Sequence, residues 1–116
     1  MRALGLAVGL GLTAAMAAAQ AETVAPADSK AHVGQTVTVE GAVSDVYTVR
    51  SGVTFINMGG RYPDNTFSAV IFSSDRAKFP DLKSLGGKTV DISGAVTLYR
   101  GKPEIVVKTA DQVKTK

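Results

Sequence analysis

The sequence predicts an all-β domain in which five strands close into a small barrel, with a short helix between the third and fourth strands. The main observation is a repeat: the stretch 36–43, Thr-Val-Thr-Val-Glu-Gly-Ala-Val, returns as 89–96, Thr-Val-Asp-Ile-Ser-Gly-Ala-Val. β-Branched and apolar residues alternate in both copies, which is the period of a half-buried strand. Each copy also carries one glycine, Gly41 or Gly94, where a strand can bend sharply. Two long strands that both bend at a glycine favour a barrel over a flat sheet.

The first 21 residues have the pattern of a secretory signal peptide. Arg2 gives a short basic start, residues 3–19 carry no charge, and Ala19-Gln20-Ala21 is a small-x-small cleavage site. A membrane anchor is the alternative, because a run of about seventeen residues is near the lower limit for a span. The run is rich in alanine and glycine, which favours the signal peptide. We therefore expect cleavage before Glu22, a periplasmic or secreted protein, and no membrane span in the mature chain.

The mature chain of about 95 residues is long enough for one domain with an adequate core. There is no cysteine, which excludes a disulfide framework and thiolate metal ligands. Removing Arg2 from the 13 basic residues leaves 12 against 10 acidic residues, a net charge of +2. This small excess gives no strong electrostatic case for nucleic-acid binding, because dedicated binders usually have a clustered basic face.

The first half of the mature chain is expected to form a leader and three strands. Residues 22–33 lack periodicity, so we expect a flexible leader to a domain that spans residues 34–116. The first strand is predicted over residues 35–47 and the second over residues 53–59, which ends at paired glycines. The third, residues 67–72, is almost wholly apolar, as is typical of a central strand covered on both faces.

The second half is expected to form a short helix, a hairpin and a tail. The helix is predicted from about Ser73, but Pro80 interrupts it, so only one or two turns are expected. The fourth strand is the second copy of the repeat and continues to Tyr99. A tight basic turn at 100–103 leads into the fifth strand over residues 104–108, and the remaining residues form a polar tail.

This order of elements resembles the oligonucleotide- and oligosaccharide-binding (OB) fold. Three strands in a meander, a short helix and a two-stranded hairpin are the arrangement of that fold, a partly open Greek-key barrel that is closed by pairing of its first and fourth strands. The two copies of the repeat fall on those two strands. The resemblance covers the whole mature domain, and an exported, free-standing chain is also similar to small bacterial periplasmic OB proteins.

The second strand has a closer resemblance, to the anticodon-binding domains of class II aminoacyl-tRNA synthetases and related single-strand binders. Its sequence Thr-Phe-Ile-Asn-Met (54–58) is followed by a glycine-rich turn. The resemblance implies that Phe55 points out of the barrel and stacks on a base, with Asn57 beside it on the outer face. The chain departs from those synthetases on the third strand, where Ala69 stands in place of a polar base-reading residue.

The residues by themselves leave two roles open for Phe55. If its ring faces outward, a stacked base gains about 1 to 3 kcal/mol from it. If the ring faces inward, it is a core residue, and its truncation to alanine costs about 3 to 5 kcal/mol of stability. Composition favours the core, because most apolar residues of so small a barrel are structural. Strand alternation favours the outer face, because Ile56 and Met58 already fill the inward register.

Basic and aromatic residues in two loops are the other candidate ligand contacts. The loop between the first and second strands and the loop between the fourth and fifth strands flank the ligand face of an OB fold. For each residue taken singly, a solvated surface position is the alternative, because most Arg and Lys side chains are exposed. Tyr62, in another loop, is expected to hold that loop in place and not to contact a ligand. The candidates are Arg50, Tyr99, Arg100 and Lys102.

The sequence has no pattern typical of an enzyme, a metal site or a cofactor site. His32 is the only histidine, and no Ser, His and Asp spacing indicates a catalytic triad. Neither glycine pair is followed by a helix, as a phosphate-binding loop would require. The aspartates are spread over loops and strands and do not converge on one metal. We therefore expect a non-enzymatic protein without catalytic residues, metal ligands or a cofactor.

Two functional hypotheses stay open at this stage. The first is a module that binds single-stranded nucleic acid, another polyanion or a glycan on the outer face of the second and third strands. The second is a module that docks an envelope protein partner on the same face, which export favours because the periplasm holds little nucleic acid. An enzyme is a third alternative, and the sequence does not indicate an oligomeric state.

Overall fold

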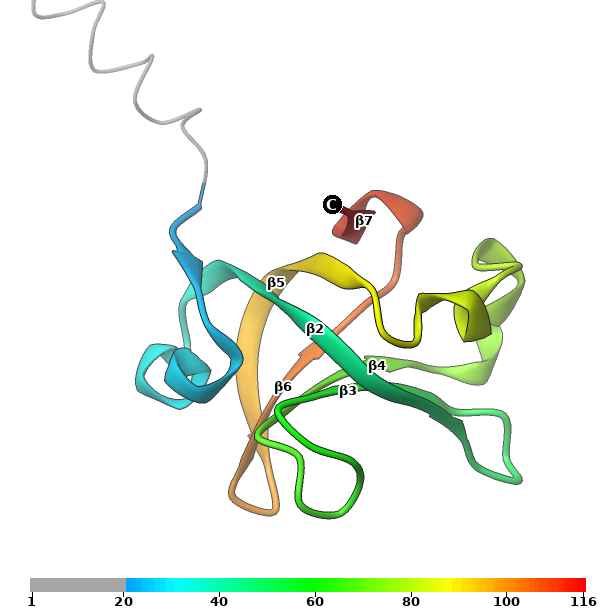
Figure 1. Ribbon diagram of the computed structural model, residues 1–116, viewed down its shortest axis with the longest axis horizontal. Coiled ribbons are helices and arrows are strands. Elements are labelled where there is room, and N and C mark those ends of the chain that lie inside the picture. The colour runs from blue at the N-terminus through cyan, green and yellow to red at the C-terminus, as the bar shows by residue number, and fades with distance from the viewer. Residues whose placement is uncertain (1–20) are drawn as a thin grey trace, which may run out of the picture.

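The computed structural model describes residues 21–116, so the predicted signal peptide lies outside the described residues except for Ala21. The described chain forms one seven-stranded sheet with short 3-10 helices around it (Figure 1). None of the helices in this part of the chain is long and apolar enough to cross a membrane. The strands are β1 (Thr23–Val24), β2 (Thr36–Thr48), β3 (Thr54–Met58), β4 (Phe67–Ile71), β5 (Thr89–Tyr99), β6 (Lys102–Val106) and β7 (Val113–Thr115), and the helices are η1 (Pro26–His32), η2 (Ser73–Lys78), η3 (Leu82–Leu85) and η4 (Ala110–Gln112).

Five of the strands form a closed ring in the order β2, β3, β4, β6 and β5, because β5 pairs back onto β2. The two copies of the sequence repeat make this closing pair, antiparallel to each other from Thr36 opposite Ala95 to Ala42 opposite Thr89. Their hydroxyls also meet across the pair, where Thr38 Oγ1 lies 2.9 Å from Ser93 Oγ. The predicted mostly-β domain with a ring of five strands is therefore confirmed.

The core fills the inside of the ring with the inward-facing residues of the long strands. Ile56 and Met58 are fully buried, as the alternation of β3 predicts. All of β4 is buried, in agreement with its apolar sequence and its position between β3 and β6. The helix predicted after this strand is two separate 3-10 turns, η2 and η3. Phe79, Leu82 and Leu85, from these turns and the link between them, complete the core cluster.

The glycines of the repeat lie where another segment comes close to the strand. A Cβ atom on Gly94 would lie 2.6 Å from Cγ2 of Ile105 on β6, and a Cβ atom on Gly41 would lie 2.6 Å from Cγ of Pro26 on η1. Gly94 also has a φ of +155°, a backbone conformation that L-residues rarely adopt. Each glycine therefore leaves room for a side chain from a different part of the chain.

Residues 22–33 differ from the flexible leader that the sequence predicts. β1 pairs in parallel with β2, Thr38 N–H donates to Glu22 O at 2.8 Å, and Val24 is buried. Within η1, the buried Ser29 hydroxyl donates to Pro26 O at 2.7 Å. These hydrogen bonds and the packing of Pro26 on Gly41 hold the segment against the ring. A two-residue strand and a seven-residue 3-10 helix leave no periodic pattern in a sequence, so this order is not visible there.

The C-terminal tail is likewise more ordered than predicted. β7 pairs antiparallel with β5, and Val113 packs against the core, as the sequence predicts for that residue alone. The Gln112 side chain donates to Ser93 O at 2.9 Å and to Val106 O at 3.2 Å, which ties η4 to β5 and to the end of β6. β1 and β7 thus extend the sheet on either side of the closing strand pair.

Candidate ligand-binding face

The outward-facing residues of β2, β3, β4 and β6 share one face of the ring. The strand register places Tyr47 opposite Phe55, Asn57 opposite Ser68, and Ser68 beside Glu104. Side chains opposite one another in neighbouring strands point to the same side of a sheet. Since Ile56 and Met58 point inward, this row points away from the core.

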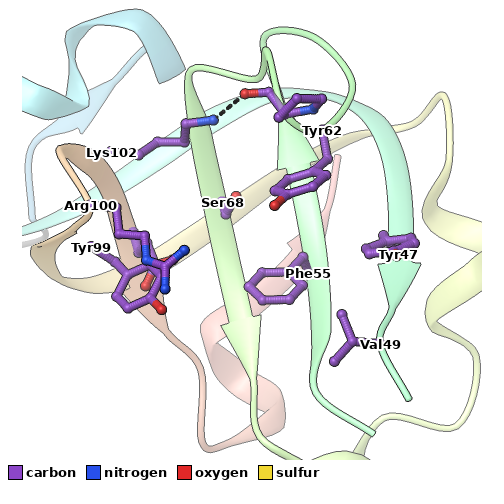
Figure 2. Close-up of a pocket in the computed structure, with 10 residues that line it drawn as sticks. Tyr47, Val49, Phe55, Tyr62, Ser68, Tyr99, Arg100 and Lys102 are labelled. Carbon is purple, nitrogen blue, oxygen red and sulfur yellow. Dashed lines mark hydrogen bonds between the residues drawn. The ribbon is translucent and has the colours of Figure 1, made fainter. Parts of the chain in front are cut away.

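A pocket with a volume of about 410 Å³ opens on this face (Figure 2). Phe55 lines the pocket and is half-buried, which settles its orientation in favour of the outer face. In Figure 2 its ring lies between Tyr47 and Tyr62 on one side and the β5–β6 hairpin with Tyr99 and Arg100 on the other. The lining residues are Tyr47, Val49, Phe55, Tyr62, Pro63, Ser68, Tyr99, Arg100, Lys102 and Glu104.

Three tyrosines around Phe55 make the pocket aromatic. The rings of Tyr47 and Tyr62 are stacked, with centroids 5.9 Å apart and planes 8° from parallel. Tyr62 is 62% exposed and Tyr99 is 54% exposed, so both residues are open to solvent. The stack joins the loop that carries Tyr62 to β2, and Tyr62 also lines the pocket.

Two of the predicted basic candidates, Arg100 and Lys102, lie at the pocket, and each is held by neighbours. Arg100 Cζ lies 5.1 Å from the ring centroid of Tyr99, and Lys102 Nζ lies 5.9 Å from that of Tyr62. Lys102 Nζ also donates to Pro63 O, the dashed bond in Figure 2, and to Asn65 Oδ1 at 3.1 Å. Arg50 is exposed beside the lining residue Val49 but is not itself among the lining residues.

The structure corrects the expectation that Asn57 contacts a ligand. Asn57 lies on the outer face, but its exposed fraction is 0% because the loop between β3 and β4 covers it. Its Nδ2 donates to Asp45 Oδ1 at 3.1 Å, and its Oδ1 accepts from Asn65 Nδ2 at 3.1 Å and from Ser68 Oγ at 2.7 Å. Every polar atom of this buried amide has a partner, so Asn57 fixes the loop that carries Tyr62.

The structure also corrects the expectation that Ala69 stands at the base-reading position of β4. Ala69 is fully buried and points into the core. The outward-facing polar residue of β4 is its neighbour Ser68, which lines the pocket. A shift of one residue along a strand exchanges the two faces, and because every residue of β4 except Ser68 is apolar, the sequence does not show which residues face outward.

Glu104 is the one carboxylate among the residues that line the pocket. Partial burial raises the pKa of Glu104 above its ordinary value, because a charged carboxylate loses hydration there. None of the ion pairs found within residues 21–116 includes this side chain. In the same part of the chain, no group of three or more His, Cys, Asp or Glu side chains could hold a metal ion. Glu104 is therefore available to accept hydrogen bonds from a ligand.

Glu104→Gln is expected to stabilise the folded domain at neutral pH but not at acidic pH. The pKa of Glu104 is higher in the folded protein than in the unfolded one, so ionising this carboxylate costs stability. The cost appears as the pH rises above about 4.3, the ordinary pKa of glutamate, and is complete above the raised pKa. Glutamine has no such cost. Urea unfolding of both proteins at about pH 4 and about pH 7 checks this. An equal difference at both pH values would contradict it.

Comparisons with solved structures identify the fold. No protein-family model and no curated protein sequence matches the chain. An asparaginyl-tRNA synthetase from Pyrococcus horikoshii matches with a TM-score of 0.54 and 21% identity, over 74% of this chain and 20% of that one. An aspartyl-tRNA synthetase from Entamoeba histolytica matches with a TM-score of 0.50 and 20% identity, over 73% of this chain and 19% of that one. An OBody bound to hen egg-white lysozyme matches with a TM-score of 0.60 and 19% identity, over 82% of this chain and 93% of the OBody.

The described domain has an OB-like fold. The resemblance of the sequence to synthetase OB domains is thus confirmed at the level of the fold. The OB-like domain spans about a fifth of the length of these synthetases but nearly all of the OBody. At this level of identity the likeness establishes architecture, and the ligand has to be argued from the pocket itself.

Sequence reasoning missed several residues of the pocket in the OB-like domain. Tyr47 and Glu104 lie inside predicted strands, where an aromatic or acidic residue by itself does not indicate a site. Val49 and Ser68 were likewise unremarkable in the sequence. The only available signal was strand alternation, which assigns Glu104 to the face opposite Ile105.

Proposed function

We propose that the OB-like domain is a non-enzymatic module that binds single-stranded nucleic acid through the pocket on β3 and β4. The observation that carries the proposal is the outward-facing aromatic cluster around Phe55, with Arg100 and Lys102 at its edge. Proteins that bind single strands combine these same two features, aromatic platforms for bases and cations for the backbone. The fold similarity to two tRNA synthetases supports the proposal.

The pocket suits one or two flat rings. Its volume of about 410 Å³ lies within the range of small-ligand sites. The half-buried ring of Phe55 offers a face for stacking, and the exposed ring of Tyr99 offers a second one. Ser68 and Glu104 provide a hydroxyl and a carboxylate that could meet polar edges of a base, or the hydroxyl groups of a sugar if the ligand is a glycan.

The charges of the face imply weak binding that depends on salt. The three cations predicted for this face, Arg50, Arg100 and Lys102, supply about three phosphate contacts, and Glu104 opposes them. With a slope of about −0.7 per contact on a single strand, three contacts give a slope of about −2 for log K against log salt. A more basic protein would give a steeper slope.

Titration of the mature domain with a fluorescent oligothymidylate at two salt concentrations tests the proposal. We expect saturable binding at low salt with a slope of about −2. Duplex DNA of the same length is the control, because its bases are not free to stack on Phe55. An absence of binding at low salt, or equal binding of duplex and single strand, would contradict the proposal.

A second candidate function is the docking of a protein partner on the same face. The OBody matches the OB-like domain over 93% of its own length, and that OBody is bound to a protein, lysozyme. Exposed tyrosines such as Tyr47, Tyr62 and Tyr99 are also typical of protein interfaces. Purification of a partner by the wild-type domain but not by Phe55→Ala, together with no oligonucleotide binding, would favour this function.

We also propose that the protein acts outside the cytoplasm. The support is the signal-like sequence of residues 1–21, with its basic start, uncharged run and small-x-small end. Cell fractionation with an N-terminal sequence of the mature protein tests this directly. A mature chain that begins at Glu22 in the periplasmic or secreted fraction is the expected result, and a full-length cytoplasmic chain would contradict it.

A further inference from the structure

A second groove, with a volume of about 300 Å³, adjoins the aromatic pocket at Arg100 and Lys102. It lies between η1 and the hairpin of β5 and β6, and the two hollows share Arg100 and Lys102. None of the residues that line this groove is acidic, whereas Glu104 lines the aromatic pocket. Apart from Ala27 and Pro103, the lining residues are Lys30, Asn65, Thr66, Arg100, Gly101 and Lys102, of which Asn65 is buried.

Lys102 is fixed at the boundary of the two hollows. Two of its three ammonium protons go to Pro63 O and Asn65 Oδ1. Asn65 is itself buried, and its Nδ2 donates to Phe67 O at 3.0 Å and to Ser68 Oγ at 2.7 Å. Lys102 therefore does not have to be ordered when a ligand arrives, and one N–H remains for an anion.

Arg100 is also held in place. Arg100 and Gly101, with φ angles of 54° and 80°, form the two-residue turn between the paired residues Tyr99 and Lys102. The Arg100 guanidinium lies over the Tyr99 ring, which leaves the N–H groups in its own plane free to donate. A Cβ atom on Gly101 would meet nothing within 4 Å, so the groove is open at this turn.

Lys30 completes the cluster from a distant part of the chain. It belongs to η1, which β1 and the packing of Pro26 on Gly41 hold against the ring. Lys30 lines this groove but not the aromatic pocket, and none of the ion pairs in the described chain uses it. Asp28 and Asp64, the acidic residues nearest along the chain to the lining residues Ala27, Lys30 and Asn65, do not line the groove.

We propose that this groove is a phosphate subsite, in which Lys30, Arg100 and Lys102 bind one phosphate group together. Three cations around one group, with no carboxylate in the groove, favour a compact dianion or a phosphodiester over a neutral ligand. If the ligand is the single strand of the proposed function, its base would lie in the aromatic pocket and an adjacent backbone phosphate in the groove. This placement of a strand rests on the proposed function. Binding of a free phosphate does not depend on that function.

Lys30→Met tests the subsite, with Lys83→Met as the matched control. Lys83 is exposed on η3 and lines neither hollow. In the first arm, inorganic phosphate is titrated into each protein and backbone amide shifts are followed by NMR. We expect saturable shifts concentrated at Thr66 and Gly101 that weaken in Lys30→Met but not in Lys83→Met. The same spectra show that each variant is folded.

In the second arm, oligothymidylate binding is measured against salt. Lys30→Met is expected to weaken binding and to make the slope less steep by less than about 0.7, because Lys30 shares its phosphate with Arg100 and Lys102, whereas Lys83→Met is expected to leave both unchanged. Identical behaviour of the two variants in both arms, or phosphate shifts spread evenly over the basic residues, would overturn the subsite. Phosphate binding in the groove without oligothymidylate binding would retain the subsite and reject the proposed strand ligand. Binding of oligothymidylate that Lys30→Met does not change would retain the proposed strand ligand and reject the subsite.

Discussion

Phe55→Ala is expected to weaken the binding of a single-stranded oligonucleotide by between about 5-fold and about 150-fold, because an aromatic platform contributes about 1 to 3 kcal/mol per stacked base. The ring lines the pocket from the middle of the outer face, and the outward residues of β2 and β4 frame it. The substitution removes no charge, so the salt dependence should not change. Fluorescence anisotropy of a labelled oligothymidylate at two salt concentrations measures both quantities.

Phe72→Ala is the matched control for this experiment. Phe72 is 45% exposed just after β4 and does not line the pocket. Its loss should leave the affinity unchanged, which separates a specific stacking site from general loss of exposed aromatic surface. Urea unfolding confirms that both variants are folded under the binding conditions. Equal losses in the two variants, or no loss in Phe55→Ala, would exclude Phe55 as the stacking residue.

Gly94→Ala is expected to lower the free energy of unfolding by about 2 to 4 kcal/mol, with contributions from overpacking and from an unfavourable backbone angle. The new Cβ atom would lie 2.6 Å from Ile105 Cγ2 and 3.1 Å from Gln112 Nε2. Ile105 is fully buried in the core cluster, so it cannot move into solvent to relieve the contact. Gln112 Nε2, which donates to acceptors on β5 and β6, would also have to shift by a few tenths of an ångström. Chemical denaturation monitored by circular dichroism measures the change.

Gly41→Ala, at the same place in the other copy of the repeat, is the internal comparison. Its Cβ atom would also approach a neighbour to 2.6 Å, but the neighbour is the half-buried Pro26 on η1. That segment is joined to the ring by the short strand β1, so it can shift more easily than the core. We expect a smaller loss of stability than in Gly94→Ala. Equal losses would show that η1 is as rigid as the core.

Much of the fold could be predicted from the repeat. Alternating β-branched residues specify two long strands, and the same polar and glycine positions in both copies make them suitable partners for each other. In the structure these copies form the pair that closes the ring. The resemblance to the OB fold followed from the order of the elements, and the fold comparisons confirm it at that level.

The composition of the candidate site was only partly predictable, and Tyr47 shows why. Counting alternate residues from Val43 places Tyr47 inside the barrel. A bulge between Val43 and Asp45 changes the register, so that Asp45 and Tyr47 face outward and Val46 packs toward the core. A bulge has no characteristic residue here, and one extra residue exchanges the two faces of the strand.

By itself, the sequence determined the five main strands, because each depends on a local period of two residues, and the repeat pointed to the pair that closes the ring. It left the direction of the Phe55 ring open, and the structure places that ring at the pocket on the outer face. Only the tertiary structure decided that the β3–β4 loop buries Asn57, and that Lys30 reaches the same groove as Arg100 and Lys102. These contacts join segments far apart in the chain. They depend on how loops and short helices pack on the finished ring, and such packing leaves no periodic pattern in the residues that make it.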